Sequence, residues 1–318
     1  MSGDSCVADY KTAEWSYYRY EPSVGVNTLF VILFTLTTVL HVVQLWKTRT
    51  WYLVSLAIGG LCRCRTCMTR CEIIGYIGRV VGAKQDVGCW TMGPFVIQSL
   101  LILIAPALMA ASIYMILGRV ILLTDGEKYA LIKRRWLTKL FVTGDVISLF
   151  AQASGGGLMA SDGQHKLGEN VTIAGLFVQL TFFGLFIVVA ALYHRRLLRA
   201  PTPEASNPKV RWQAYLITLY VTGALIWVRS LFRVIEFIQG NDGSIMKSEA
   251  YVFIFDGLLM FVVLAWMNWF HPSEIGLLLR GNQPITNGLQ LLKLRGPEGK
   301  DAERLSSSAN NTIVGDQH

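Results

Sequence analysis

The sequence predicts an all-α, polytopic membrane protein: a seven-transmembrane helix bundle with the N-terminus outside and the C-terminus cytosolic. Of its 318 residues, 53% are hydrophobic and only 16% are charged, whereas soluble domains carry about 25% charged residues. The apolar residues form blocks long enough to cross a bilayer. Lysines and arginines lie between these blocks, so the net charge of +8 indicates membrane topology and contact with anionic lipid, not nucleic-acid binding.

Six apolar blocks are each long enough to form a membrane span. They cover residues 24–46, 95–123, 140–160, 171–193, 212–238 and 251–270. Residues 1–23 lack the apolar core of a cleavable signal and are expected to form an extracellular tail. The transmembrane domain then spans residues 24–270, and residues 271–318 form a polar cytosolic tail that we expect to be mostly disordered.

The second span is split by a polar nonapeptide. Apolar residues 53–61 are followed by Arg63–Cys71 (RCRTCMTRC) and then by residues 73–81. Neither half reaches the ~20 residues that cross a bilayer, and each arginine at mid-membrane would cost roughly 2.5–3.5 kcal/mol. Without the nonapeptide the flanks read as one helix of spanning length. We interpret it as an insertion, either a translated piece of intron or a genuine bulge.

Orientation follows from the basic loops. Loops after the first, third and fifth spans carry Lys47 and Arg49, a cluster over 128–139, and a cluster over 195–211. The loops on the other side hold only Lys84, Lys166 and Lys247, with Arg79 at a helix end. Basic loops stay in the cytosol, which places the N-terminus outside.

Polar residues within the spans are the candidate site, because such groups are costly in lipid and commonly functional. Helical spacing puts Glu72, Tyr76 and Arg79 on one face, and does the same for Arg229, Arg233 and Glu236. Most of the set falls in the outer half of the bundle, which predicts a polar cavity between helices. The candidates for lining it are Glu72, Tyr76, Arg79, Gln98, Asp145, Gln152, Gln179, Arg229, Arg233, Glu236 and Asp256.

A structural interpretation stands beside the functional one. Glu72 would pair with Arg229 or Arg233, and Asp256 with the other arginine, holding the helices in register. The glutamines would then form hydrogen bonds between helices. The Gly155–Gly157 run and a kink at Pro106 would let helices shift.

Metal and catalytic motifs are weak. His41, His194 and His271 lie near the cytosolic face, where a membrane hydrolase could hold a metal, but each sits at a helix end without a metal motif. Cys64, Cys67 and Cys71 resemble half of a zinc site. No P-loop, dinucleotide fingerprint or nucleophile elbow occurs. We therefore predict no enzyme activity, metal or cofactor, and leave a Cys6–Cys89 disulfide open.

Several segments together resemble the fungal RTA-like, lipid-translocating exporter family over residues 18–280. The resemblance is carried by Tyr20-Glu-Pro-Ser23 with Asn27, by Glu72-Ile-Ile-Gly-Tyr-Ile-Gly-Arg79, by Gln98 through Ala105-Pro106-Ala107 to Tyr114, by Gly118-Arg119, by Phe141 through Asp145 to Gln152 with Gly155–Gly157, by Gly175-Leu176 to Gln179, by Arg229-Ser-Leu-Phe-Arg-Val-Ile-Glu236, by Glu249 with Asp256, and by His271-Pro272. The nonapeptide Arg63–Cys71 departs from the family pattern.

The resemblance implies export or flipping of amphipathic, lipid-like molecules, among them sphingoid long-chain bases and amino-sterols, in stress or drug resistance. Glu72, Asp145 and Asp256 would attract an amine headgroup, and Arg229 and Arg233 would balance these acids or contact phosphate. We expect the plasma membrane as location, with endomembranes as the alternative. The alternative function is a seven-helix lipid sensor, or a regulator of lipid asymmetry without transport activity.

Overall fold

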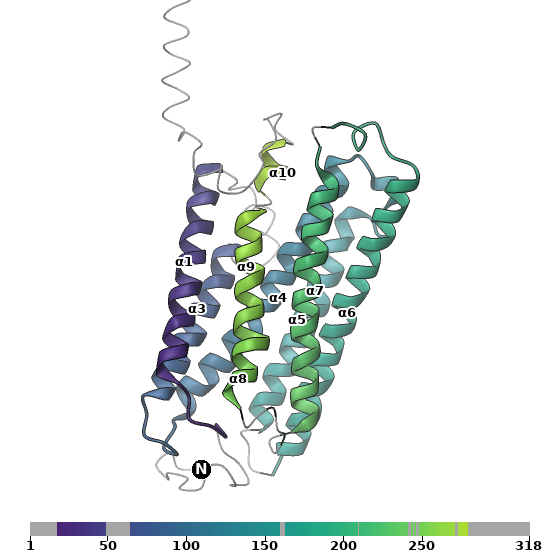
Figure 1. The fold of residues 1–318 in the computed structure, drawn as a ribbon. Helices are drawn as coiled ribbons and strands as arrows, with labels where there is room; N and C mark the ends of the chain where they lie inside the picture. The colour runs from purple at the N-terminus through teal and green to yellow at the C-terminus, as the bar shows by residue number, and fades with distance from the viewer. Residues whose placement is uncertain are drawn as a thin grey trace, which may run out of the picture.

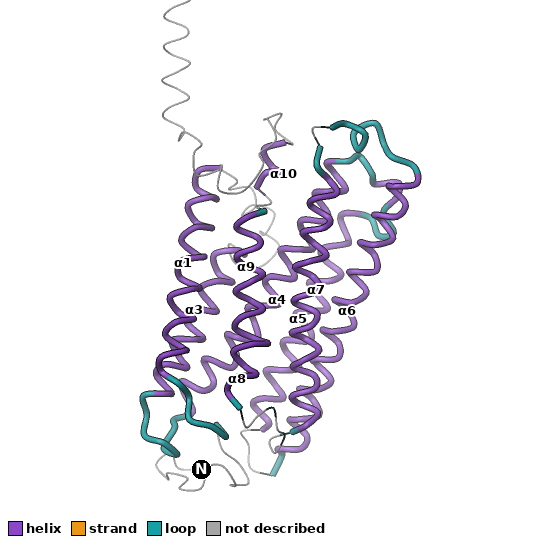
Figure 2. The backbone as a smooth tube through the Cα atoms, in the orientation of Figure 1, coloured by secondary structure: helices purple, strands orange, loops and turns teal. Residues whose placement is uncertain are grey.

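The computed structural model describes residues 18–48, 64–159, 163–208, 210–240, 243, 245, 248–270 and 273–278. Within these residues, seven long helical segments stand side by side (Figure 1). Figure 2 shows helices and connecting loops, with no strand in the described part of the chain. The predicted all-α fold class is therefore confirmed.

The helices are α1 (Val24–Thr48), α3 (Cys64–Ala83), α4 (Met92–Leu123), α5 (Arg134–Met159), α6 (His165–Arg199), α7 (Trp212–Gln239), and a seventh segment made of α8 (Glu249–Val252), the π-helix η2 (Phe253–Leu258) and α9 (Leu259–Trp269). Two short elements complete the list, the 3₁₀ turn η1 (Glu127–Tyr129) and α10 (Ser273–Leu278).

The helices form a closed ring. Each described long helix packs against the next one along the chain, and α9 contacts both α7 and α1. The helix α4 also contacts α7 across the ring. This arrangement gives every long helix at least two neighbours and brings α3, α4, α7 and η2 near one another.

In the described part of the chain, five helical segments meet the length and composition expected of a membrane span: Val24–Gln44, Gly93–Leu123, His165–Arg199, Trp212–Gln239 and Glu249–Gly276. The helices α3 and α5 do not, because charged residues lower their mean hydropathy. Both still expose large apolar side chains, Ile77 on α3 and Phe150 on α5 among them, and Phe150 is 72% exposed. The chain is thus an integral membrane protein, while the count of seven spans and the orientation of the termini stay predictions.

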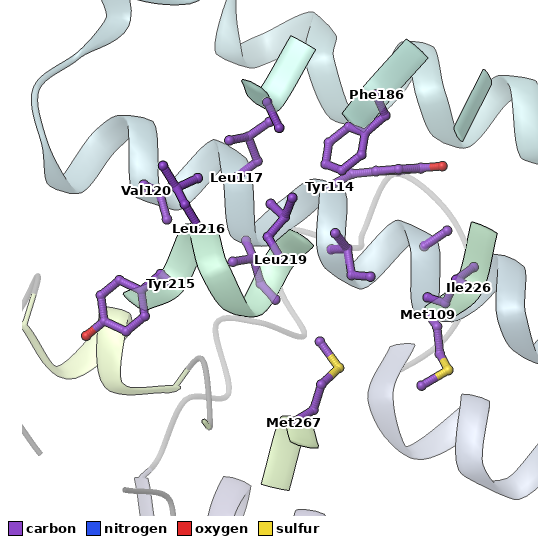
Figure 3. Packing of buried hydrophobic residues seen from close by; sticks show 14 of the residues in the cluster. Met109, Tyr114, Leu117, Val120, Phe186, Tyr215, Leu216, Leu219, Ile226 and Met267 are labelled. Carbon is purple, nitrogen blue, oxygen red and sulfur yellow. The ribbon is translucent and has the colours of Figure 1, made fainter. Parts of the chain in front are cut away.

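Figure 3 shows the apolar core, which lies between α4, α6, α7 and α9. Leu117, Phe186 and Leu216 are fully buried there, and Met267 approaches from α9. Tyr114 belongs to the same cluster, with its ring centroid 4.5 Å from that of Phe186. This core fixes α4 and α7 relative to each other, and both helices carry residues of the candidate site.

Loops at one end of the bundle are tied together. The hydroxyl of Thr202 donates to the carbonyl oxygen of Thr124 at 2.5 Å, and the hydroxyl oxygens of Thr124 and Tyr193 are 2.6 Å apart. The loop after α4 therefore contacts both the end of α6 and the loop after it. This is the end at which α10 lies in Figure 1, opposite the end of the bundle where α1 begins.

Several predicted boundaries were wrong. The residues Arg134, Arg135 and Lys139, expected in a loop, lie in the first turns of α5, because long basic side chains can extend from a helix toward the interface. The helix α6 begins at His165, six residues before the predicted block 171–193. In the tail expected to be mostly disordered, residues 273–278 form α10, and the other tail residues lie outside the described ones.

The nonapeptide is helical wherever it is described. The helix α3 runs without interruption from Cys64 through Glu72 to Ala83. Residues 64–71 are therefore no bulge on this helix; they form its first two turns. Arg63 and residues 53–62 lie outside the described residues.

Candidate functional site

The helix α3 turns its polar side chains toward the inside of the bundle. The side chains of Glu72, Tyr76 and Arg79 are buried, as their shared helix face predicted. The other face is exposed, with Arg70 followed along the helix by the apolar Ile74, Ile77 and Val81. Soluble proteins show the reverse pattern, with charges outside. An inside-out helix of this kind fits lipid on its outer side and a polar region on its inner side.

Small residues let α3 approach α4 closely. A Cβ atom at Gly78 would stand 3.3 Å from the carbonyl oxygen of Pro94, and one at Gly75 would stand 3.0 Å from the side chain of Ile102. Glycine at such positions allows helix backbones to pack tightly in membranes. The close approach holds Glu72 at a fixed depth beside α4.

Five ionisable side chains form what we call the inner charge cluster: Glu72, Arg229, Arg233, Glu236 and Asp256. Its centre is Asp256, which is 2% exposed. Its Oδ1 lies 3.0 Å from Arg229 Nε and accepts from Arg233 Nε at 3.1 Å. Arg233 also donates through Nη2 to Asp256 Oδ2 and through Nη1 to Glu236 Oε2 at 2.9 Å. Two guanidinium groups thus compensate two carboxylates within the bundle.

Asp256 lies in the π-helical turn η2. A π turn carries an extra residue, which shifts the direction of the side chains after it, and such turns are frequent at functional sites. The neighbouring Gly257 brings the backbone of η2 close to α3, since a Cβ atom there would stand 2.6 Å from the Tyr76 hydroxyl oxygen. The π-helix therefore places Asp256 between α7 and α3, which sequence periodicity did not predict.

Glu72 is the one member of the inner charge cluster without an ion pair. It is 2% exposed, and its Oε1 is buried without a hydrogen-bond partner. Arg229, Arg233 and Asp256 lie close enough to act on it electrostatically. The predicted pairing of Glu72 with one arginine is therefore wrong: Asp256 forms ion pairs with both arginines, because the π-helix places its carboxylate between them.

Arg229 also forms a hydrogen bond with a backbone carbonyl of α4 that has no donor within the helix. Pro106 lies inside this helix and has no N–H, so the carbonyl of Ile102, four residues earlier, loses its usual donor. Arg229 Nη2 donates to this carbonyl oxygen at 2.9 Å. Arg229 therefore satisfies the freed carbonyl, and this one arginine links α4 to Asp256.

A second polar network closes the end of the bundle where α1 begins. Arg79 donates to Asn27 Oδ1 at 3.0 Å and, through Nη2, to the Tyr20 hydroxyl and to Glu249 Oε1, both at 2.9 Å. Glu249 also accepts from the backbone N–H of Ser23 at 2.9 Å. Burial raises the pKa of the Tyr20 phenol above its ordinary value, so this hydroxyl stays protonated. We call these five residues the terminal network.

The terminal network contains residues that the list of site candidates missed. Glu249 lies at the start of α8 and Asn27 near the start of α1, so a search for charges inside spans passed them over. Their only sequence signal was their place in the segments that carry the family resemblance. The network ties α1, α3 and α8 together.

The remaining candidates lie in separate pairs. Gln152 donates to Gln179 at 3.0 Å, linking α5 to α6, as predicted for hydrogen bonds between helices. The Tyr114 hydroxyl donates to Asp145 Oδ2 at 3.0 Å, linking α4 to α5. The predicted grouping of Asp145 with Glu72 and Asp256 has no support in these contacts. Gln98 is buried where α4 faces Gly78.

The predicted flexibility of Gly155–Gly157 does not fit the packing at Gly155. A Cβ atom at Gly155 would stand 2.6 Å from the carbonyl oxygen of Gly168 and 2.8 Å from the backbone nitrogen of Thr172 on α6. Gly156 and Gly157 have no atom within 4 Å of such a position. Gly155 therefore serves close contact between α5 and α6, while its two neighbours face outward.

The histidines and cysteines have local roles where they are described. His41 Nδ1 lies 2.9 Å from the Thr37 carbonyl oxygen, and His194 Nδ1 lies 3.2 Å from the Tyr220 hydroxyl. No three His, Cys, Asp or Glu residues gather as a metal site among the described residues. Cys89 is disulfide-bonded. Cys6, with which a disulfide was left open, lies outside the described residues, as do His271 and the side chains of Cys64 and Cys67.

Comparison with known proteins identifies the family. The family model described as "RTA1 like protein" matches residues 66–277. The chain is similar to Protein RTA1 of Saccharomyces cerevisiae, with 36% identity over 78% of this chain and 82% of the relative. It is also similar to two other proteins of that species, Protoporphyrin uptake protein 1 (40% identity, 61% of this chain and 62% of the relative) and Sphingoid long-chain base transporter RSB1 (26% identity, 84% and 76%).

No solved structure matches the chain significantly. The family model covers two thirds of the sequence and includes every residue of the inner charge cluster. The chain therefore belongs to the RTA1-like protein family.

Proposed function

We propose that this protein translocates amphipathic, lipid-like molecules with a cationic amine headgroup, such as sphingoid long-chain bases, across the plasma membrane. The observation that carries the proposal is Glu72, whose buried carboxyl group has no ion pair inside a membrane bundle. Ionisable groups in such places commonly mark a substrate path. A relative named as a sphingoid long-chain base transporter supports the substrate class.

Within the inner charge cluster, the arginines and Glu72 have different roles in binding the ligand. Arg229 and Arg233 are already occupied by Asp256, Glu236 and the Ile102 carbonyl, which favours balancing the acids over contacting phosphate. Glu72 has an oxygen left for a ligand. An ammonium group donates three hydrogen bonds and carries one positive charge, so it would satisfy that oxygen and the surplus negative charge together.

The proposal involves binding and movement but no chemical step. It assigns no catalytic residue, cofactor or metal. Removing sphingoid bases or related amphiphiles from one leaflet would make cells resistant to them. Membrane lipids are thus the expected surroundings and an amphipathic amine the expected ligand.

A flip assay tests the proposal. The purified full chain is reconstituted in liposomes with a fluorescent sphingoid base, and movement between leaflets is followed by quenching from outside. We expect the wild type to accelerate movement and Glu72→Gln to slow it at least tenfold. Glu169→Gln, the same change on α6 away from both polar networks, is the matched control and should leave the rate within twofold.

Two outcomes would contradict the proposal. Equal rates for Glu72→Gln and the wild type, at equal expression and folding, would remove Glu72 from recognition. Binding of the base by wild-type protein without any movement would favour the alternative function, a lipid sensor or regulator.

A further inference from the structure

The charges of the inner cluster do not sum to zero. Arg229 and Arg233 contribute two positive charges, and their partners Asp256 and Glu236 contribute two negative charges. These four side chains balance one another through direct ion pairs. An ionised Glu72 would therefore add one uncompensated negative charge, buried and without a hydrogen bond to its Oε1.

The surroundings of Glu72 favour its neutral form when no ligand is bound. The charged groups that act on it are Arg229 and Arg233 from α7 and Asp256 from η2, and Tyr76 lies one turn along α3. The packed helices α1 and α4 add no described charged group to this set. Because both arginines already serve other carboxylates, an unpaired Glu72 anion would be costly in the membrane interior. A proton on the carboxyl group removes that cost.

The same carboxyl group cannot hold a proton and pair fully with an ammonium group. Resting on the function proposed above, we propose that Glu72 exchanges one proton for one amine headgroup. The empty site holds the neutral Glu72 carboxylic acid. Binding of R–NH₃⁺ breaks the O–H bond, releases that proton to water, and leaves a carboxylate that pairs with the ammonium; no electrons are transferred and the charges balance.

Exchange at Glu72 couples the movement of the amine to the movement of a proton. If either the amine or the proton occupies Glu72, each passage of an amine in one direction is linked to return of a proton in the other. A proton gradient could then drive the amine uphill without ATP. The ligand class is a protonated primary amine on an apolar chain, since the pairing requires a positive charge.

Calorimetry of binding measures the exchange directly. The full chain in lipid nanodiscs is titrated with dihydrosphingosine between pH 6 and 7.5, where a primary amine stays protonated because its ordinary pKa is about 10. Repeating the titration in buffers of different ionisation enthalpy gives the number of protons released. We expect about one proton per bound amine for the wild type, because the neutral acid must ionise to pair. Glu72→Gln should release none and bind at least tenfold more weakly, and Glu169→Gln should match the wild type.

A second measurement needs no variant. If one proton leaves for each amine bound, the wild-type dissociation constant falls about tenfold for each unit of pH increase on the acid side of the Glu72 titration. Amine binding with no proton release and no dependence on pH overturns the exchange and leaves the proposed function standing. Proton release by Glu72→Gln equal to that of the wild type assigns the proton elsewhere and also overturns it. Absence of amine binding by folded wild-type protein overturns the proposed function itself.

Discussion

The hydrogen bond between Arg229 and the Ile102 carbonyl predicts a measurable coupling between two distant positions in the sequence, 106 and 229. Pro106 leaves the carbonyl without its helical donor, and Arg229 Nη2 supplies one at 2.9 Å. Replacing Arg229 by methionine removes this donor and one of the two cationic partners of Asp256. We therefore expect Arg229→Met to destabilise the bundle strongly when proline is present at position 106.

The change Pro106→Ala restores an N–H group at that position, and α4 can then satisfy the Ile102 carbonyl by itself. A buried carbonyl left without a donor costs about 1–3 kcal/mol. Arg229→Met should therefore lower the free energy of unfolding by about 1–3 kcal/mol less in the Pro106→Ala background than in the wild type. The part of the loss that comes from the Asp256 ion pair should remain, because alanine at position 106 does not replace it.

Unfolding in mixed micelles with increasing dodecyl sulfate, followed by tryptophan fluorescence, gives the four free energies of the cycle. The control cycle uses Arg233→Met, since no contact of Arg233 with the Ile102 carbonyl occurs among the described residues. That cycle should be additive within about 0.5 kcal/mol. Additivity of Arg229→Met with Pro106→Ala would refute the reasoning, because it would mean that the carbonyl does not depend on the arginine.

Three further predictions use the same kind of matched comparison. Gly155→Ala should lower the thermal stability of the purified protein, since its Cβ would stand 2.6 Å from a backbone oxygen of α6, whereas Gly156→Ala faces open space and should leave the melting temperature unchanged; equal effects would contradict the close packing. Arg79→Glu should destabilise the terminal network, and adding Glu249→Arg should recover at least half of the lost melting temperature, because their ion pair at 2.9 Å is reversed and not removed; no recovery would mean that the surrounding hydrogen bonds dominate. In the flip assay the full chain should be active with residues 63–71 present, because α3 is intact from Cys64 onward; activity only after their deletion would mark them as an inactivating insertion.

The fold class was predictable because the length of an apolar segment is enough to identify a membrane helix. The same physics explained why α3 buries Glu72, Tyr76 and Arg79, since three- and four-residue spacing fixes a shared face. The ion-pair partners of each charged residue were not predictable from this spacing. Which arginine meets Asp256 depends on the π-helix η2, and a single extra residue in a turn leaves no clear mark in sequence periodicity. Gly155 was misinterpreted because glycine serves either flexibility or close approach, and only its neighbours on α6 distinguish the two.

The contrast between the two polar networks separates structural roles from functional ones. In the terminal network, one guanidinium group meets one carboxylate, and Glu249 also binds the Ser23 N–H and the Asn27 amide; this set holds three helix ends together. The inner charge cluster has four paired side chains and one carboxylate left over. Evolution toward stability alone would remove such a group, since an apolar residue of similar size is often at least as stable as a buried ion. Glu72→Leu should therefore keep or raise the melting temperature while abolishing amine movement, and a loss of both together would instead make Glu72 a structural residue.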